Sequence, residues 1–208
     1  MDGLGLGVLL EQQRISRVTA SYIGENKEFA RQYLAGELEL ELVPQGGLAE
    51  RLRSAGAGIP AFYTPAGVGT LIADGGLPLR YGPDGQVAVA SSPKEVREFP
   101  TTLPDGTQRR QRYVLEEAID IDVALVRAAR GDWLGNLVLH AAARNFNPLC
   151  AIAGRIAIAE VEQLVEPGEI APDEVHLPGV FVHRVVELSA ADADLKHIEK
   201  RTTQESRR

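Results

Sequence analysis

The sequence contains a single cysteine, Cys150, among its 208 residues. One thiol cannot form an internal disulfide bond, so nothing in the chain points to an oxidising compartment. No apolar run approaches the roughly 18 residues that a membrane-spanning helix needs, and the opening MDGLGLGVLLEQQR lacks the basic segment and the cleavage site of a signal peptide. We therefore expect a cytoplasmic protein with no membrane partner.

Positive charge is also scarce. The chain has 22 Lys and Arg against 29 Asp and Glu, for a formal net charge of -7 at pH 7. An acidic chain without a basic domain is poorly suited to a phosphate backbone, so we expect no nucleic-acid partner. The four histidines lie far apart without metal-ligand spacing, so we expect no metal site, and we expect His140 and His183 to be structural residues in strands.

The chain has an ordinary globular composition, with 44% hydrophobic and 25% charged residues and no internal repeats. Helical spacing of apolar residues predicts helices over 26–38, with Asn26 as its cap, and over 47–56. Short apolar runs between turn residues predict strands, at 17–23, 38–44, 59–63, 87–91, 112–119, 123–129, 136–142, 155–165 and 180–188. The run VALVRAARGDWLGNLVLHAA is expected to be a hairpin or bent strand pair that turns at Gly131 to Gly135. The expected fold class is α/β, an open and mostly parallel sheet with flanking helices followed by a strand-rich second half.

Glycine is concentrated in the stretch VPQGGLAERLRSAGAGIPAFYTPAGVGT, which covers residues 43–70. The segment GAGIPA at 56–61 fits the spacing of a dinucleotide-binding loop, but it follows a predicted helix and precedes a predicted strand. A dinucleotide loop requires the reverse order. These glycines are better explained as the end of a helix, so we expect no nicotinamide cofactor.

The earlier string VPQGG has the order that a ligand site requires. A strand ends at Pro44, Gln45 follows it, and Gly46 and Gly47 open a helix, where free backbone N–H groups and the helix dipole can meet a ligand. Gln45 is therefore a candidate polar contact. An exposed glutamine in a simple helix-entry turn explains the same pattern.

Other polar residues allow two interpretations. Glu25 stands in YIGENKEF at a strand-to-helix turn, a position typical of a catalytic residue, but a carboxylate that caps the helix is the favoured interpretation. The loop ARNFNPLC at 143–150 is either a binding loop or a set of Asx turns. The remaining notable carboxylates alternate with apolar residues or sit in strands and are expected on solvated faces: Glu37, Glu39, Glu41, Glu116 and Glu117. Cys150 is expected to be a buried thiol and not a nucleophile.

Long consecutive strings carry a family resemblance. The string that begins SYIGENKEF and ends TPAGVGT, together with EVREF, YVLEEAI, ALVRAARGDWLGN and ARNFNP, resembles the alpha (A) subunit of the succinyl-CoA:3-ketoacid CoA-transferases, which are family I CoA-transferases. The resemblance runs from about Asp2 to about Glu187. It implies an α/β fold of the CoA-transferase and sugar-phosphate isomerase type. It also implies a ping-pong transfer of coenzyme A from succinyl-CoA to acetoacetate through a glutamyl-CoA thioester on the enzyme.

In the family that glutamate lies in a Ser-Glu-Asn-Gly motif of the beta (B) subunit. This chain has no such motif, and its nearest string is Gly24-Glu25-Asn26. The resemblance therefore implies no catalytic residue in this chain, a B-subunit partner in a heterodimer or heterotetramer, and no permanently bound cofactor, with a CoA thioester and a 3-oxoacid as substrates. The CoA and substrate cleft is expected to include Gln45, Gly46, Gly47, Glu25, Asn26, Gly67 and Gly69.

Family members begin with a strand and a Gly-Gly-Phe-Gly loop before they reach a segment like MDGLGLGVLL. On this resemblance we expect the first strand-loop-helix unit to be missing from this chain, a CoA-transferase domain over 1–188 and a polar tail over 189–208. The string EFPTTLPDGTQRRQRYV is expected to be a surface hairpin insertion. The alternative functions are transfer between acetyl-CoA or another short-chain acyl-CoA and acetoacetate, a non-catalytic assembly partner, and a sugar-phosphate isomerase.

Overall fold

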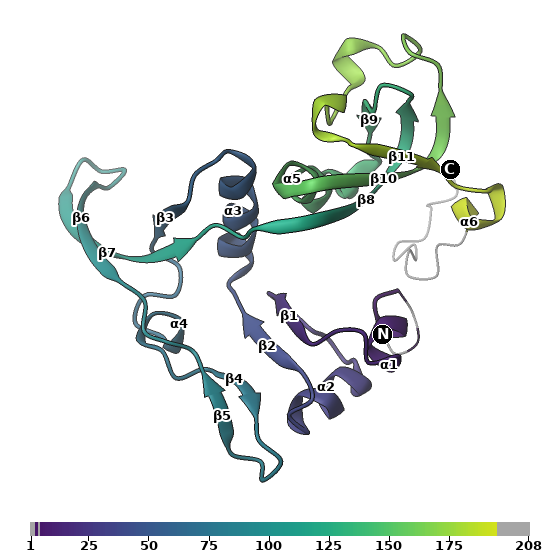
Figure 1. Ribbon diagram of the computed structural model, residues 1–208. Coiled ribbons are helices and arrows are strands. Elements are labelled where there is room, and N and C mark those ends of the chain that lie inside the picture. Colours follow the sequence, from purple (N-terminus) through teal and green to yellow (C-terminus); the bar gives the residue numbers. More distant parts are fainter. Residues whose placement is uncertain (1–2, 4, 195–208) are drawn as a thin grey trace, which may run out of the picture. The chain divides into compact units, whose positions relative to one another are not determined.

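The computed structural model describes residue 3 and residues 5–194, and the chain divides after Ile119 into two compact units (Figure 1). Each unit has its own helices, strands and buried residues, and each is described by itself. The predicted tail at 189–208 lies mostly outside the described residues. Within it, Ala190–Asp194 forms the short helix α6.

Unit 1 begins with two strand-to-helix steps. Its elements are α1 (Gly7–Glu11), β1 (Arg17–Ala20), α2 (Lys27–Leu34), β2 (Glu39–Leu42), α3 (Gln45–Gly56), β3 (Ala61–Thr64), α4 (Leu71–Asp74), β4 (Pro78–Tyr81), β5 (Val87–Ala90), β6 (Val96–Thr102) and β7 (Gln108–Glu117). Strands β1 and β2 are parallel, with Val18 opposite Leu40. The segments that lead to α2 and α3 therefore leave the same edge of this two-stranded sheet.

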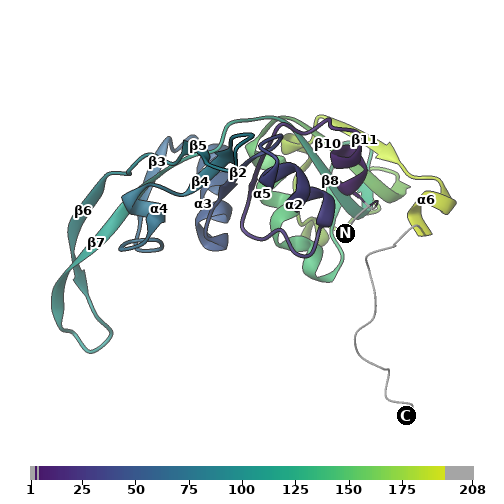
Figure 2. The ribbon, with the colours of Figure 1, turned by 90° about the horizontal axis from the view of Figure 1, so that it is seen from below.

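The other strands of unit 1 form antiparallel sheets. β7 pairs with β3 on one side and β6 on the other, and β4 pairs with β5. The string predicted as a surface hairpin forms the long β6–β7 hairpin, and both views show it as an extended ribbon (Figures 1 and 2). Three edge-on aromatic rings, those of Tyr63, Phe99 and Tyr113, pack across its base. Such ring pairs stabilise neighbouring strands.

The core of the first strand-to-helix steps contains Leu10, Phe29, Leu38 and Leu40. Burying each of these side chains stabilises the fold by about 1.5–3 kcal/mol. The buried amide of Gln32 is satisfied, because its Nε2 donates to the Leu10 carbonyl and to Glu28, both at 2.7 Å.

Unit 2 is built on a βαβ unit. Its elements are β8 (Ile121–Asp132), β9 (Leu137–Val138), the 3-10 turn η1 (Ala141–Arg144), α5 (Phe146–Ala153), β10 (Gly154–Val165), the 3-10 turns η2 (Pro172–Glu174) and η3 (Gly179–Phe181), β11 (Arg184–Glu187) and α6. The sheet order is β11-β10-β8-β9, and β10 is parallel to both β8 and β11. Its core consists of small and branched residues, among them Ala157, Ala159 and Val161, which are fully buried.

Most predicted elements are present. The α/β class is confirmed, and the strands of the described part are distributed over four sheets. The predicted turn at Gly131 to Gly135 joins the antiparallel strands β8 and β9. The half-buried thiol of Cys150 on α5 has a pKa raised by burial, in line with its predicted role. No helix among the described residues is long and apolar enough to cross a membrane.

Two local predictions are wrong. His140 and His183 lie outside strands, although His183 is structural because its Nδ1 accepts a hydrogen bond from the Ala157 N–H at 3.1 Å. The stretch predicted as the loop 143–150 is mostly helix α5. Asn147 lies within that helix, where its side chain accepts from the Arg127 N–H and donates to the Ala143 carbonyl.

Candidate active site

The first turn of α3 contains the glycine-rich string of the predicted cleft. The helix begins at Gln45, two residues earlier than predicted, after Pro44 in an extended conformation with no side-chain cap. The first backbone bond at this end runs from the Leu48 N–H to the Pro44 carbonyl at 2.9 Å. The N–H groups of residues 45–47 precede that bond and carry the positive end of the helix dipole, which suits an anionic oxygen.

The two glycines of this turn differ in their surroundings. A Cβ at Gly46 would meet no atom within 4 Å, whereas one at Gly47 would lie 3.6 Å from Val43 Cγ1. Gly46 is exposed and Gly47 is buried. Nothing in the fold requires glycine at position 46, and glycine in a helix costs about 1 kcal/mol relative to alanine. The missing side chain leaves the backbone of this turn accessible to another molecule.

Asn26 caps α2. Its side-chain oxygen accepts a hydrogen bond from the Phe29 N–H at 2.7 Å, and the residue is 9% exposed. This bond satisfies one free donor of the helix and explains the asparagine structurally. Glu25 next to it is exposed. Asn26 and Glu25 come after the carboxyl end of β1, and Gln45 comes after the carboxyl end of β2. Because the two strands are parallel, all three residues lie toward the same edge of the sheet.

Gly67 and Gly69 follow a strand of a different sheet. They lie in the turn after β3, which pairs with β7 and not with β2. Gly67 has a φ of +94°, and a Cβ there would lie 2.7 Å from Ile72 Cγ2, so the turn itself requires glycine. Thr70 then caps α4 by accepting from the Ile72 N–H. The hydrogen-bonding pattern does not connect this turn with the first turn of α3.

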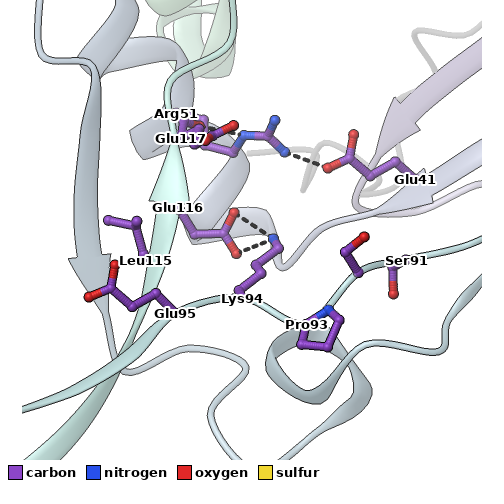
Figure 3. Close-up of a pocket in the computed structure, with 10 residues that line it drawn as sticks. Glu41, Arg51, Ser91, Pro93, Lys94, Glu95, Leu115, Glu116 and Glu117 are labelled. Carbon is purple, nitrogen blue, oxygen red and sulfur yellow. Dashed lines mark hydrogen bonds and ion pairs between the residues drawn. The ribbon is translucent and has the colours of Figure 1, made fainter.

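A polar cavity of about 380 Å³ lies within unit 1 (Figure 3). It is lined by Glu41, Arg51 and residues 91–95 and 115–117. Glu116 is 3% exposed, and Lys94 Nζ donates to its two carboxylate oxygens at 2.7 and 2.8 Å. A buried carboxylate needs such a partner, because an unpaired charge in this place would be strongly destabilising.

Arg51 approaches the same cavity from α3. Its Nη1 donates to Glu41 Oε1 at 2.8 Å and its Nε donates to the Glu117 carbonyl oxygen at 2.8 Å. Glu41 also accepts from Arg17 and Thr19 on β1. Burial raises the pKa of Glu41, but the hydrogen bond and charge of Arg51, with the hydrogen bonds of Arg17 and Thr19, outweigh it and hold that pKa below its usual value of 4.5.

This cavity was not predicted from the sequence. Glu41 and Glu116 were expected on solvated faces, but Glu116 is buried and Glu41 is largely enclosed by its two arginine partners. Glu41 is paired with Arg51, 10 residues away in the sequence, and Glu116 is paired with Lys94, 22 residues away. A charged residue between apolar neighbours in YVLEEAI was the one available signal, since strand faces alternate and one of two adjacent carboxylates must face inward.

Unit 2 has a second cavity, of about 370 Å³, lined by 127–129, 140–143, Asn147 and Glu162. Arg127 is held there by Glu162 at 2.9 Å. Among residues 3 and 5–194, no group of three or more metal-binding side chains is close enough to hold an ion.

Sequence comparison identifies relatives over almost the whole chain. The family model for coenzyme A transferase matches residues 1–188. The A subunit of a probable succinyl-CoA:3-ketoacid coenzyme A transferase of Mycobacterium bovis is 66% identical over 186 residues, 89% of this chain and 71% of that protein. The corresponding A subunit of the Xanthomonas campestris enzyme is 55% identical, over 99% of this chain and 72% of the relative. A mitochondrial succinyl-CoA:3-ketoacid coenzyme A transferase of Mus musculus is 46% identical, over all of this chain and 38% of its own length.

Solved structures share the fold. Glutaconate coenzyme A-transferase from Acidaminococcus fermentans superimposes with a TM-score of 0.67 at 18% identity, covering 93% of this chain and 62% of that one. An acyl-CoA transferase from Escherichia coli O157:H7 does so with a TM-score of 0.59 at 22% identity, covering 82% of this chain and 32% of that one. The fold, the matching family model and the extended identity to named relatives lead to one conclusion: this chain is an enzyme chain of the coenzyme A transferase family.

Proposed function

We propose that this chain is the A subunit of a heteromeric 3-oxoacid CoA-transferase that moves coenzyme A from succinyl-CoA to acetoacetate. The observation that carries the proposal is the 66% identity over 186 residues to a relative named as the A subunit of such an enzyme. The open first turn of α3 supports it, because uncapped N–H groups beside an exposed Gln45 suit an acyl-CoA oxygen.

In the proposed reaction the nucleophile is a glutamate of the B subunit. Its carboxylate attacks the thioester carbonyl of succinyl-CoA and expels the CoA thiolate, which leaves a mixed anhydride between the glutamate and succinate. The thiolate then attacks the glutamyl carbonyl and expels succinate, which carries away one oxygen of the glutamate. Acetoacetate then takes CoA from the glutamyl thioester by the same steps in reverse, which regenerates the free carboxylate. No step oxidises or reduces a substrate.

In this proposal Gln45 and the N–H groups of Gly46 and Gly47 contact the CoA thioester. Hydrogen-bond donors held in place before the reaction stabilise the negative charge that develops on the thioester oxygen. The carboxylates of this chain do not act as nucleophiles. Glu116 and Glu41 are bound to Lys94 and Arg51. The proposed cleft also includes Glu25, Asn26, Gly67 and Gly69.

The test is to co-express this chain with its candidate B subunit, then to measure acetoacetate-dependent release of succinate from succinyl-CoA. We expect activity in the complex and none in either chain alone. A complex that assembles but releases neither succinate from succinyl-CoA nor acetate from acetyl-CoA would contradict the proposal and favour a non-catalytic assembly partner. Activity with acetyl-CoA alone would change the substrate and keep the reaction class.

A further inference from the structure

We propose that Arg51 is a positioning residue that holds the first turn of α3 in place for the CoA thioester; this role rests on the function proposed above. The residue lies in the middle of α3 and its side chain is 11% exposed. Its guanidinium bonds to Glu41 and to the Glu117 carbonyl, and not to Gln45 or the glycines. Its effect would pass along the helix.

Arg51 connects α3 with two sheets that share no strand pairing. Its Nη1 reaches Glu41 on β2, in the parallel β1–β2 sheet, and its Nε reaches the Glu117 carbonyl on β7, in the β3-β7-β6 sheet (Figure 3). In addition, the Ile119 N–H donates to the Arg51 carbonyl oxygen at 3.3 Å. Both the side chain and the backbone of this one residue therefore fix α3 to the end of β7.

The acceptor on β2 is itself well fixed. Glu41 Oε2 accepts from Arg17 Nη2 at 2.9 Å and from Thr19 Oγ1 at 3.2 Å, so its carboxylate is anchored on β1 as well. Arg51 thus binds to a group that would keep its position if the arginine were replaced. Loss of the guanidinium would release the helix more than the strand.

The distance along the helix is short enough for this effect. Arg51 stands six residues after Gln45, which is about 9 Å at the α-helical rise per residue. A hydrogen-bonded helix of this length moves as a rigid rod, so a shift at Arg51 displaces the first turn by a similar amount. A displacement of about 1 Å in a binding element can cost as much as about 100-fold in rate.

The chemistry of the side chain explains why arginine fits here. The planar guanidinium presents donors in two fixed directions, and here they serve a carboxylate and a backbone carbonyl at the same time. A lysine ammonium could reach one of these acceptors from its flexible stem but would not fix the angle between them. Arg51→Lys should therefore keep the charge and lose part of the positioning.

Arg53 on the same helix provides a matched control. Its guanidinium bonds to Glu50 within α3, and its side chain is 46% exposed. Arg53→Met removes the same charge and the same kind of side chain without releasing α3 from either sheet. Any effect of losing one cation from the helix appears in both methionine variants.

The kinetic experiment uses the complex with the B subunit. We expect Arg51→Met to lower kcat/KM for succinyl-CoA, per active site, by about 10-fold or more, and Arg51→Lys to give a smaller loss. A merely structural role would lower the number of active sites, counted by the covalent CoA adduct on the B subunit, and leave kcat/KM per active site unchanged. That result, or equal kinetics of the Arg51→Met and Arg53→Met complexes, would overturn the proposal.

A second measurement does not need activity. Amide hydrogen exchange of the peptide that covers 43–50 should be faster in Arg51→Met than in Arg53→Met, because the first turn is less firmly held. Equal exchange would overturn the positioning role. If the wild-type complex transfers no CoA but exchange still differs, the proposed function and the catalytic part of this role fail, whereas the mechanical link between Arg51 and α3 stands.

Discussion

The ammonium group of Lys94 donates to both carboxylate oxygens of the buried Glu116, at 2.7 and 2.8 Å. Lys94 comes from the segment between β5 and β6, and Glu116 lies on β7. The pair joins two segments in the wall of the polar cavity (Figure 3). A paired buried charge is tolerated, but the loss of one partner leaves the other without compensation.

Lys94→Met should therefore destabilise the chain by about 3–5 kcal/mol, measured by urea unfolding. The double variant Lys94→Met with Glu116→Leu should recover a large part of this loss, since no buried charge is left unpaired. Lys27→Met, at an exposed position, is the control. If the single and double variants were equally unstable, the pairing would not be the cause of the effect.

We predict that removing the buried hydroxyl of Ser54 stabilises the folded chain. This residue of α3 is fully buried, and its Oγ has no hydrogen-bond partner among the described residues. An unsatisfied buried polar group costs about 1–3 kcal/mol, so Ser54→Ala should raise the melting temperature. Ser92→Ala, on an exposed residue, should leave it unchanged. A lower melting temperature for Ser54→Ala would show that the hydroxyl is satisfied in solution.

Gln45→Ala should lower turnover of the reconstituted complex while assembly stays intact, because an exposed helix-entry residue contributes little to folding. The loss of one donor to the developing oxyanion would reduce kcat by about 100-fold. Gln86→Ala, at an exposed turn, is the matched control. Unchanged kinetics would return Gln45 to its alternative interpretation as a simple helix-entry residue.

Gly46→Ala should separate stability from function. The added methyl group meets no atom within 4 Å, so the isolated chain should gain up to about 1 kcal/mol from the better helix former. In the complex the methyl group would stand where the proposed site brings CoA against the backbone, and the KM for succinyl-CoA should rise. A variant that is more stable and binds CoA thioester unchanged would place the substrate elsewhere.

The ion pair between Glu41 and Arg51 should make the free energy of unfolding depend on pH. The pKa of Glu41 is lowered in the folded chain, so the unfolded chain takes up this proton first as the pH falls. The stability contributed by Glu41 is present above pH 4.5 and is lost as the pH falls through the lowered pKa. The difference in unfolding free energy between wild type and Glu41→Gln should therefore shrink below pH 4.5. A difference independent of pH would contradict this.

Sequence patterns predicted helix ends and turns well where neighbouring residues alone determine them. The cap at Asn26, the hairpin at β6–β7 and the turn between β8 and β9 all depend on residues close together in the sequence. The loop predicted around Asn147 is mostly helix because that side chain bonds to Arg127, twenty residues earlier. Such a partner is invisible to local propensity.

The candidate site was predictable in part. The order of strand, Gln45 and glycines located the first turn of α3, because chain order alone fixes which end of a helix is open. The pairs of Arg51 with Glu41 and of Lys94 with Glu116 depend on how separate strands and a helix meet, and periodicity describes each element alone. The sequence therefore did not predict these two enclosed ion pairs, which only the structure shows.

The most direct test of the central claim is intact mass measurement of both proteins of the complex after incubation with succinyl-CoA and no acceptor. We predict a covalent CoA adduct on the B subunit, none on this chain, and loss of the adduct when acetoacetate is added. A CoA adduct on this chain, or none on either protein of a complex that transfers CoA, would contradict the account.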